Sequence, residues 1–543
     1  MRRRAAIVAL AAILAIGGCL ALGANPCSAQ GDDARSPAEA AWARGRALAD
    51  SGRYAEALEV VRAALARDPD DTGLLWLEAG VAGWAGRHGE SVALLETLAG
   101  KYPEMADRVR LDLATQRLWA GDARGALAEV DRSLEAHPGD RGARRTRALI
   151  LSFSDRTREA TAEYERLLAE DPADAEARVG LARALNWAGK HRRAARLYRA
   201  LLDEKAGDPE VLRGLAYAEY WSDRPDRARA PLAALLARRP DDGEGVALDR
   251  RLARDARPAL TASHSASDDS DDLRVLANAL ALSVPLGSRD VVLAIAERVE
   301  VKDPGGEHRL HRPGIGHQRI WSDAWSSAAR VNFQSQRSDT LSDRVLWDLG
   351  LRYRPMDGLR FEIGLSRDQI LTRRALDRGV TVATGFVGVD YEPAPRWILH
   401  GSIRGNDYRD GNRSWLTEGA VSYRVLSRRD LTATGRLQGR YLAARDDLDN
   451  GYYDPLGYAE VGPGVSLSWE PRFGCVIEAS GRTGLQKERG GETDPFFSME
   501  ARVEAPLGDF FAIGGDASRS DSNLSSESGF ERTAWSLYIT ARR

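Results

Sequence analysis

Charged residues that alternate with apolar ones are the most informative chemistry in this 543-residue chain. Within residues 344–366, Arg344, Asp348, Arg352 and Glu362 recur between apolar residues at a period of two. Successive side chains of a β-strand point to opposite faces, so such a segment has one apolar and one charged face. Guanidinium and carboxylate groups can hydrogen-bond each other and a polar passenger. No Ser-His-Asp neighbourhood accompanies them, so the pattern indicates binding rather than covalent catalysis.

The same alternation continues through the second half of the chain, where we read sixteen strands between Ala259 and Thr540. A barrel of about sixteen strands is wide enough for an aqueous channel, and the charged face would line it. Taken singly, each charge is best explained as solvated lining, but as a set they favour a polar passenger. The predicted channel-lining residues are Arg344, Asp348, Arg352, Glu362, Asp368, Arg404, Glu418, Arg436, Arg440, Glu478, Arg482, Glu500 and Arg502.

The connections between these strands sort into two alternating classes. Pro355–Gly358 is a short turn, whereas Lys302–His311 and Leu371–Arg378 read as longer polar loops. Outer-membrane barrels have short periplasmic turns, longer outer loops, an even strand number and strands of about ten residues. A soluble sandwich also alternates but would not sort its loops in this way. Residues 258–543 are therefore predicted to form an antiparallel transmembrane β-barrel of about 16 strands.

The apolar face of the predicted strands would contact lipid, with Leu351, Ile363 and Leu437 among its residues. Tryptophan and tyrosine are enriched where a membrane protein meets the headgroups. Aromatic residues near the short turns would therefore form a girdle at the periplasmic interface. The predicted girdle residues are Trp347, Tyr353, Trp397, Tyr423 and Trp469.

The N-terminus has the pattern of a secretory signal. Arg2-Arg3-Arg4 precedes the apolar run Ala5–Leu22, and small residues end at Ala29. We predict a signal peptide over residues 1–29 and a linker over 30–37. The alternative is a lipoprotein signal in which Cys19 is lipidated. No later stretch has the ~20 apolar residues of a membrane helix, so any membrane insertion after export must use strands.

The first half of the chain repeats at a fixed period. Small turn residues recur 34, 35, 34, 34 and 34 positions apart, each followed by a spaced alanine-like residue and a closing proline. This pattern resembles the tetratricopeptide repeat, whose helix–turn–helix units bury their apolar faces by stacking. Residues 38–257 are therefore predicted to form an α-solenoid of about six repeats. The turn residues are Gly52, Gly86, Gly121, Asp155, Gly189 and Asp223.

Aromatic residues stand two positions before most of these turns, and they include Trp84, Trp119, Trp187 and Trp221. Aromatic residues at a position fixed by the repeat usually pack between successive units. The alternative interpretation is an aromatic-lined groove that stacks on sugar rings or grips a peptide. Both readings remain open from the sequence alone.

Several functional classes find no support. The formal net charge of -3 does not favour nucleic acid as a partner. Cys475 is the one cysteine after the predicted signal, so the exported chain has no disulfide framework or paired-cysteine metal site. His308, His311 and His317 cluster near one predicted loop, which we interpret as a solvated loop rather than a metal site. We expect no enzyme activity, no metal and no cofactor.

The phrases Leu118-Trp119-Ala120-Gly121 and Asn186-Trp187-Ala188-Gly189, followed later by the strands, carry a resemblance to a known family. The chain resembles the outer-membrane export proteins for exopolysaccharides, in particular the poly-N-acetylglucosamine porin and more distantly the cellulose export protein. Its barrel is also similar to the YaiO family. The resemblance implies a monomeric barrel in the outer membrane, surrounded by lipid and lipopolysaccharide, with periplasmic repeats.

The resemblance also implies partners. These are a polysaccharide polymer, which would slide through the lumen, and periplasmic biosynthesis or modification proteins held near the pore mouth by the repeats. An alternative is a non-exporting barrel that serves as scaffold or receptor and whose repeats recruit periplasmic proteins. An outer-membrane enzyme is a third class, for which the sequence offers no catalytic triad.

Overall fold

The computed structural model describes residues 36–154, 156–204, 207–336, 344–394, 396–427, 430–448, 450–471, 474–524 and 531–543. The predicted signal peptide and nearly all of the predicted linker lie outside the described residues. The chain divides into two compact units. The first unit comprises Met1–Trp221 and Arg227–Leu248, and the second comprises Ser222–Asp226 and Asp249–Arg543.

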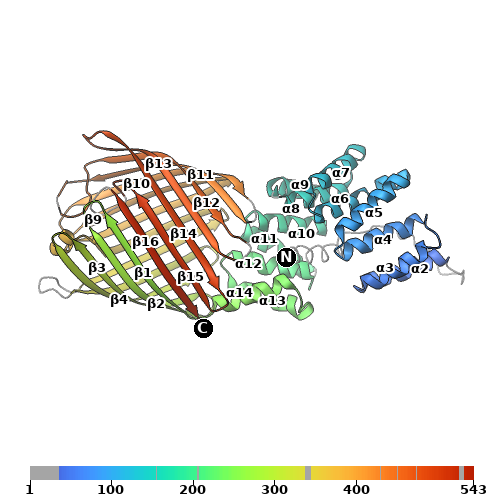
Figure 1. Ribbon diagram of the computed structural model, residues 1–543, viewed down its shortest axis with the longest axis horizontal. Coiled ribbons are helices and arrows are strands. Elements are labelled where there is room, and N and C mark those ends of the chain that lie inside the picture. The colour runs from blue at the N-terminus through green and yellow to red at the C-terminus, as the bar shows by residue number, and fades with distance from the viewer. Residues whose placement is uncertain are drawn as a thin grey trace. The chain divides into compact units, whose positions relative to one another are not determined.

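Thirteen α-helices follow one another in the described part of the chain before the first strand (Figure 1). None of the described helices is both long and apolar enough to cross a bilayer. The helices are α2 (Pro37–Asp50), α3 (Tyr54–Leu65), α4 (Thr72–Trp84), α5 (His88–Lys101), α6 (Ala106–Trp119), α7 (Ala123–Ala136), α8 (Arg141–Phe153), α9 (Thr157–Glu170), α10 (Ala175–Trp187), α11 (His191–Glu204), α12 (Pro209–Trp221), α13 (Pro225–Arg238) and α14 (Gly243–Asp255).

The turns between paired helices need a left-handed residue. Gly52, Gly86 and Gly189 have φ values of 78°, 76° and 74°, and Asp223 takes the same conformation at 60°. Glycine reaches this region without a Cβ penalty, which explains why it recurs at the turn position. Asp155, the aligned residue of the fourth repeat, lies outside the described residues.

Small residues let the helices of the solenoid pack closely. A Cβ on Gly180 would come within 2.3 Å of the Tyr164 ring, and a Cβ on Gly214 would meet the Tyr198 ring at the same distance. Both tyrosines are buried in a continuous cluster with alanine and leucine residues of α8–α12. The apolar faces of single repeats are thus buried by their neighbours, as in other stacked-repeat proteins.

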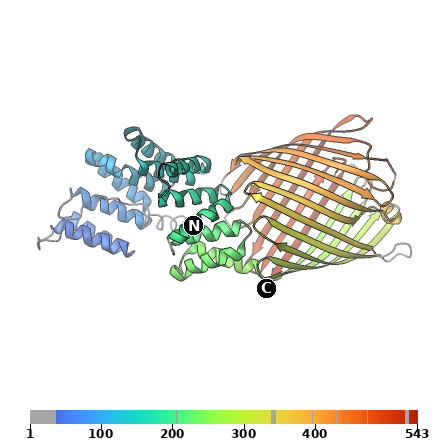
Figure 2. The same cartoon turned by 180° about the vertical axis from the view of Figure 1, so that it is seen from behind.

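The second half of the chain is one closed sheet of sixteen strands, each antiparallel to its neighbours, with β1 paired to β16 (Figures 1 and 2). The strands are β1 (Ala259–Asp269), β2 (Arg274–Leu286), β3 (Asp290–Asp303), β4 (Gly306–Ile320), β5 (Trp325–Gln336), β6 (Arg344–Met356), β7 (Leu359–Gln369), β8 (Thr381–Ala394), β9 (Trp397–Tyr408), β10 (Arg413–Ser427), β11 (Leu431–Ala444), β12 (Tyr458–Trp469), β13 (Val476–Glu488), β14 (Thr493–Leu507), β15 (Phe511–Ser520) and β16 (Arg532–Arg542).

The two ends of the barrel differ in their connections. We call the end with the β2–β3, β4–β5 and following connections the turn end, and the end with the β1–β2, β3–β4 and following connections the loop end. The turn between β6 and β7 has two residues, Asp357 and Gly358. The connection between β7 and β8 spans residues 370–380 and contains a short helix, α15 (Arg373–Asp377). Long connections therefore occur at the loop end.

The predicted loop over Lys302–His311 was wrong. β3 continues to Asp303 and β4 begins at Gly306, so a two-residue turn replaces the loop. Gly306 has a φ of 147°, a conformation that side chains rarely adopt and glycine allows. The polar residues of this segment alternate in the strand with Leu310, which is buried. Because most residues of this segment are polar, the alternation of apolar and polar residues that identifies a strand is weak here.

Large apolar side chains are exposed along one face of the sheet, among them Leu351, Ile363, Leu437 and Val465. At the turn end of the same face, Trp325 stacks on Tyr353 at 4.2 Å between ring centroids, and other aromatic pairs follow around the barrel. Trp347 does not belong to this group, because it lies near the start of β6, at the loop end. Its assignment to the turn-end girdle was therefore wrong.

Candidate functional site

The charged face of the sheet is its concave inner face. Tyr538 on β16 donates a hydrogen bond to Glu504 on β14 at 2.9 Å, across the intervening strand β15. Contacts over an intervening strand form on the concave side of a barrel. Arg502 is on the same face, 3.4 Å from the Tyr538 hydroxyl. By cross-strand register, all the predicted lining residues lie on this inner face.

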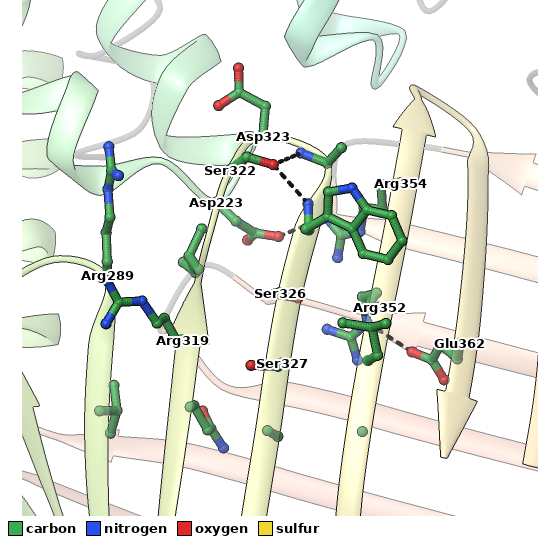
Figure 3. Close-up of a pocket in the computed structure, with 18 of the residues that line it drawn as sticks. Asp223, Arg289, Arg319, Ser322, Asp323, Ser326, Ser327, Arg352, Arg354 and Glu362 are labelled. Carbon is green, nitrogen blue, oxygen red and sulfur yellow. Dashed lines mark hydrogen bonds and ion pairs between the residues drawn. The ribbon is translucent and has the colours of Figure 1, made fainter. Parts of the chain in front are cut away.

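Two cross-strand ion pairs lie on β5–β7. The Arg330 guanidinium donates to Asp348 on the neighbouring strand at 2.6 Å. One hairpin further, Arg352 donates to Glu362 at 2.8 Å (Figure 3). Three of these residues were predicted. Arg330 was missed, although it alternates with Ala329 and Val331 in the same way as the residues that were found.

A longer chain of contacts crosses β7 to β11. Arg360 lies 2.5 Å from Asp390, Asp390 lies 2.8 Å from His400, and His400 lies 3.7 Å from Glu418. Glu418 in turn accepts from Arg436 at 3.3 Å. Glu418 and Arg436 were predicted, whereas Arg360, Asp390 and His400 were not. Arg360 and Asp390 stand between outward-facing apolar residues, and His400 follows Leu399, so the period of two could have revealed them.

Glu460 on β12 is the most enclosed charge of the inner face, with 3% of its surface exposed. Arg440 on β11 and Arg482 on β13 both donate to its Oε1, the latter at 2.6 Å. Tyr458 and Ser522 donate to the other carboxylate oxygen at 2.9 and 2.5 Å. Both arginines were predicted, but Glu460 was not. Its donors come from three strands and from the β15–β16 connection.

Three further predicted residues lie outside these ion-pair chains. Arg344 donates to the Gln369 side chain at 2.7 Å and to the Gly379 carbonyl at 2.8 Å, near the loop end. Asp368 accepts from the backbone N–H of Gln369. The Arg404 guanidinium lies 5.9 Å from the centre of the Phe386 ring. These side chains share the inner face but not one site.

A recess of about 260 Å³ opens in the inner wall over β11–β14. It is formed by two neighbouring rows of cross-strand positions. Small hydroxyl side chains on β11 and β12 continue into Ser480 and Glu478 on β13, and then into charged side chains on β14. We call it the hydroxyl recess. Its lining includes Thr432, Thr434, Ser466, Ser468, Ser480, Glu478, Glu500 and Arg502. The last three were predicted from the sequence, and the structure brings them together here.

The inner face of β16, β1 and β2 carries a different surface. It consists of hydroxyl and methyl groups in register with one another, and Thr261 and Thr540 are hydrogen-bonded at 3.0 Å. We call this the hydroxyl sector, formed by Thr261, Ser263, Ser265, Ala277, Ala279, Ala281, Ser283, Ser536, Tyr538 and Thr540.

A second recess, of about 520 Å³, lies at the turn end and is shown in Figure 3. It is lined by residues of β3–β8 and of the segment Ser222–Asp226, which belongs to the same compact unit. Arg354 donates to Asp223 at 2.7 Å within it. Arg352 and Glu362 form its inner wall, which connects the recess to the ion pairs of the inner face.

The connections at the loop end contact one another. On α15, Leu376 is buried against Val299, Val301 and Leu310 of β3 and β4. Thr372, just before this helix, donates to the Gly451 carbonyl of the β11–β12 connection at 2.5 Å. Leu371–Arg378 was predicted as a polar loop, and its inward-packed leucine could not be recognised without the partner strands. Part of the loop end is therefore covered by chain segments.

A second group of contacts ties the β9–β10 connection to the β11–β12 connection. Asn412 donates to Asp454 at 2.9 Å, and Tyr452 donates to Asp410 at 2.8 Å. The Tyr408 and Tyr452 rings stack at 4.2 Å. Burial raises the pKa of the Asp454 carboxyl from 3.8 to about 6. This carboxyl can change its charge near neutral pH.

The predicted repeat aromatics contact one another or a cation. Phe153 lies edge-on between Trp119 and Trp187, with ring centroids 4.6 Å away on each side. The Trp84 ring is covered by the Arg46 guanidinium, and Trp221 lies 5.3 Å from the His191 ring. Trp187 and Trp221 remain 38% and 39% exposed, so packing and binding are both compatible with their surroundings.

The three histidines of β4 do not converge. His308 lies on the inner face, 2.7 Å from Asp377 of α15. His311 and His317 lie on the opposite, outer face, where His317 is 2.8 Å from Asp290. Alternation within one strand separates His308 from the other two.

Three family models, each described as a tetratricopeptide repeat, match residues 38–82, 146–209 and 187–252. No curated protein matches the sequence. Among solved structures, the chain is similar to a bacterial polysaccharide outer membrane secretin at 16% identity, over 53% of this chain and 99% of that chain, with a TM-score of 0.45.

The chain is also similar to CdiB from Acinetobacter baumannii at 12% identity, over 52% of this chain and 60% of that chain, with a TM-score of 0.35. It is similar to a tetratricopeptide repeat protein from Parabacteroides merdae at 17% identity, over 40% of this chain and 85% of that chain, with a TM-score of 0.33. The repeat matches and the strand pairing confirm the predicted combination of tetratricopeptide repeats and a sixteen-stranded barrel.

Proposed function

We propose that this protein is an outer-membrane porin that exports a polar polymer, an exopolysaccharide. The observation that carries the proposal is the contrast between the two faces of the closed sheet. The outer face exposes leucine, isoleucine and valine with aromatic pairs at the turn end, which suits a lipid environment. The inner face carries ion pairs and hydroxyl groups, which suit a hydrated passage for a polar chain.

The lining residues of this passage are those predicted from the sequence, extended by Arg330, Arg360, Asp390, His400 and Glu460. In this proposal the turn end faces the periplasm, and the tetratricopeptide repeats bind the polymer or the proteins that make or modify it. Stacked repeats present extended surfaces of this kind. Many weak contacts along the wall suit translocation, since binding must be loose enough for release.

A second candidate function is a barrel that does not export, whose repeats recruit periplasmic proteins. The contacts at the loop end favour it, because the β7–β8 and β11–β12 connections are hydrogen-bonded to each other through Thr372 and Gly451. A loop end that stays covered would stop a polymer but would not affect recruitment by the repeats.

Two measurements together separate the two functions. The full chain is reconstituted in planar bilayers, and polymer secretion is measured in cells that carry or lack the gene. The export proposal expects ion conductance and loss of secreted polymer when the gene is deleted. A barrel without conductance and unchanged secretion would contradict export and favour the recruiting scaffold.

A further inference from the structure

Many of the charges on the inner face are organised as pairs of opposite sign. Arg330, Arg352, Arg360 and Arg440 each contact a carboxylate on the next strand. A further pair of opposite sign joins Glu418 on β10 and Arg436 on β11. Such pairs thus recur around the wall from β5 to β13, and among the described residues neither sign forms a ring.

This alternation has an electrostatic consequence. A lumen attracts a charged passenger when charges of one sign line it, because their fields add. Paired charges of opposite sign cancel each other beyond a few ångströms, and salt screens what remains over about 8 Å. The wall therefore gives little net attraction to a polyanion or a polycation.

A polyelectrolyte would also meet a repelling group for every attracting one. To bind, it would have to separate pairs such as Arg352–Glu362, whose members are 2.8 Å apart. An uncharged polyhydroxylated chain faces no such cost, since its hydroxyl groups can donate to the carboxylates and accept from the guanidinium groups while the pairs stay intact.

The hydroxyl recess matches such a chain in size and chemistry. Its volume of about 260 Å³ is slightly below the ~300–1,000 Å³ of sites for drug-sized ligands, which suits about one or two sugar rings. Its rows pair Thr434 with Ser466 and Ser466 with Ser480, and Glu500 follows on the next strand. Hydroxyl groups that both donate and accept, beside a carboxylate, can match the hydroxyl groups of a sugar residue.

We propose that the passenger is an uncharged, polyhydroxylated polymer and that its sugar residues dock in the hydroxyl recess of β11–β14. This inference rests on the proposed export function and specifies the charge class of its substrate. The hydroxyl sector of β16, β1 and β2 adds a stretch of wall without charged side chains among its named residues, along which such a polymer can slide.

The test uses the full chain in planar bilayers, with three probes of equal length: uncharged maltoheptaose, a seven-residue oligogalacturonate and a seven-residue chitosan oligomer, each at pH 6. We expect maltoheptaose to interrupt the ion current at a concentration about fivefold or more below that of either charged probe. We also expect a permeability ratio of cations to anions near one, within about twofold, because the described residues of the wall form no ring of one sign.

Variants locate the binding site. Thr434→Val, Ser466→Ala and Ser480→Ala each remove one hydroxyl of the recess, and each should raise the half-blocking concentration of maltoheptaose about fivefold, the value of one lost hydrogen bond. Ser402→Ala is the matched control, because Ser402 lies on the inner face of β9 away from the recess. The half-blocking concentration of maltoheptaose on Ser402→Ala should equal that on the parent chain.

The outcomes distinguish the two proposals. A chain that conducts no ions overturns the export function, and the inference with it. A conducting chain that is blocked more tightly by the chitosan oligomer or by oligogalacturonate overturns the inference alone and leaves export standing. Equal effects of the recess variants and of Ser402→Ala overturn the assignment of the recess.

Discussion

The Arg482 guanidinium on β13 donates to the Glu460 carboxylate on β12 at 2.6 Å, inside the barrel wall. Arg440 approaches the same carboxylate oxygen from the other side. One carboxylate thus holds two guanidinium groups together, and its own surface is 3% exposed. Without it, two like charges would face each other in a poorly hydrated place.

Glu460→Gln tests this arrangement. The amide keeps the size of the side chain but removes the charge that separates Arg440 from Arg482, so we expect barrel stability to fall by about 3–5 kcal/mol, the usual cost of breaking a buried pair. Urea unfolding of the barrel in lipid vesicles measures the change. The control is Glu531→Gln at the loop end, where both members of the pair with Arg519 are exposed, and its stability should stay within about 1 kcal/mol of the parent chain.

Arg352→Gln tests whether the paired wall sets ion selectivity. The substitution leaves Glu362 without its cation at 2.8 Å, so the lumen gains a net negative group. We expect the cation-to-anion permeability ratio to rise about twofold, measured as the reversal potential in a salt gradient. Arg413→Gln is the control, because Arg413 pairs with Asp407 on the exposed outer rim. An equal change of the permeability ratio in Arg352→Gln and Arg413→Gln would contradict the placement of the Arg352–Glu362 pair in the lumen.

Gly214→Ala tests the close packing of the solenoid. The new Cβ would lie 2.3 Å from the ring of Tyr198, which is buried. Overpacking of this kind costs about 1–3 kcal/mol. Thermal unfolding of the helical circular dichroism signal of the full chain should therefore occur at a lower temperature.

Gly89→Ala is the opposite case in the same solenoid. Gly89 lies within α5, and a Cβ there would meet nothing within 4 Å. Alanine in a helix is favoured over glycine by about 0.5–1 kcal/mol, so this variant should unfold at a slightly higher temperature. Stabilisation by both variants would show that the gap at Gly214 is not filled by the Tyr198 ring.

The loop-end contacts should strengthen as pH falls. The pKa of Asp454 is about 6 in the folded loop against 3.8 ordinarily, so the folded loop binds a proton that the open loop releases between these values. The contribution of Asp454 to the stability of the folded loop is therefore greatest below about pH 4 and is lost as pH rises through 6. Asp410 and Asp447, the other carboxylates that act on this group, favour the same direction.

Hydrogen exchange of the β11–β12 connection measures this effect. After correction for the intrinsic pH dependence, exchange of the Leu448 N–H, which donates to Asp454, should be slower at pH 5 than at pH 7.5. Asp454→Asn should remove the difference, because an amide does not titrate. The control Asp446→Asn changes a carboxylate whose side chain is 44% exposed and which does not contact Asp454, so it should leave the difference in place. A pH effect that survives Asp454→Asn would assign it to another group.

The strand period allowed the inner face to be predicted, because position in a strand alone decides the side on which a residue lies. Arg352 and Glu362 were predicted in this way, and Arg360 and Glu460, which were not predicted, follow the same rule. The misplaced Trp347 shows the limit of the rule, since the period identifies the face but not the height along the strand. The loop assumed over Lys302–His311 shows that a polar strand can imitate a loop.

Contacts between distant segments could not be predicted from the chain. Ser522 reaches Glu460 from a connection 62 residues away, and Thr372 reaches Gly451 across 79 residues. No local pattern announces such partners, because they depend on where the closed sheet brings each connection. The hydroxyl recess is similar, since Thr434 and Glu500 share a wall only through the register of three strand pairs.

The pairing of β1 with β16 determines how this barrel must be assembled. Thr261 and Thr540 are hydrogen-bonded although 279 residues separate them, so closing the sheet brings its first and last strands together. Until β16 is in place, two strand edges remain open, and hydrocarbon offers no hydrogen bonds to their backbone groups. In the membrane location that we propose, a chain that ends before Arg532 would leave the edges of β1 and β15 unpaired, so the eleven-residue strand β16 is needed to close the sheet.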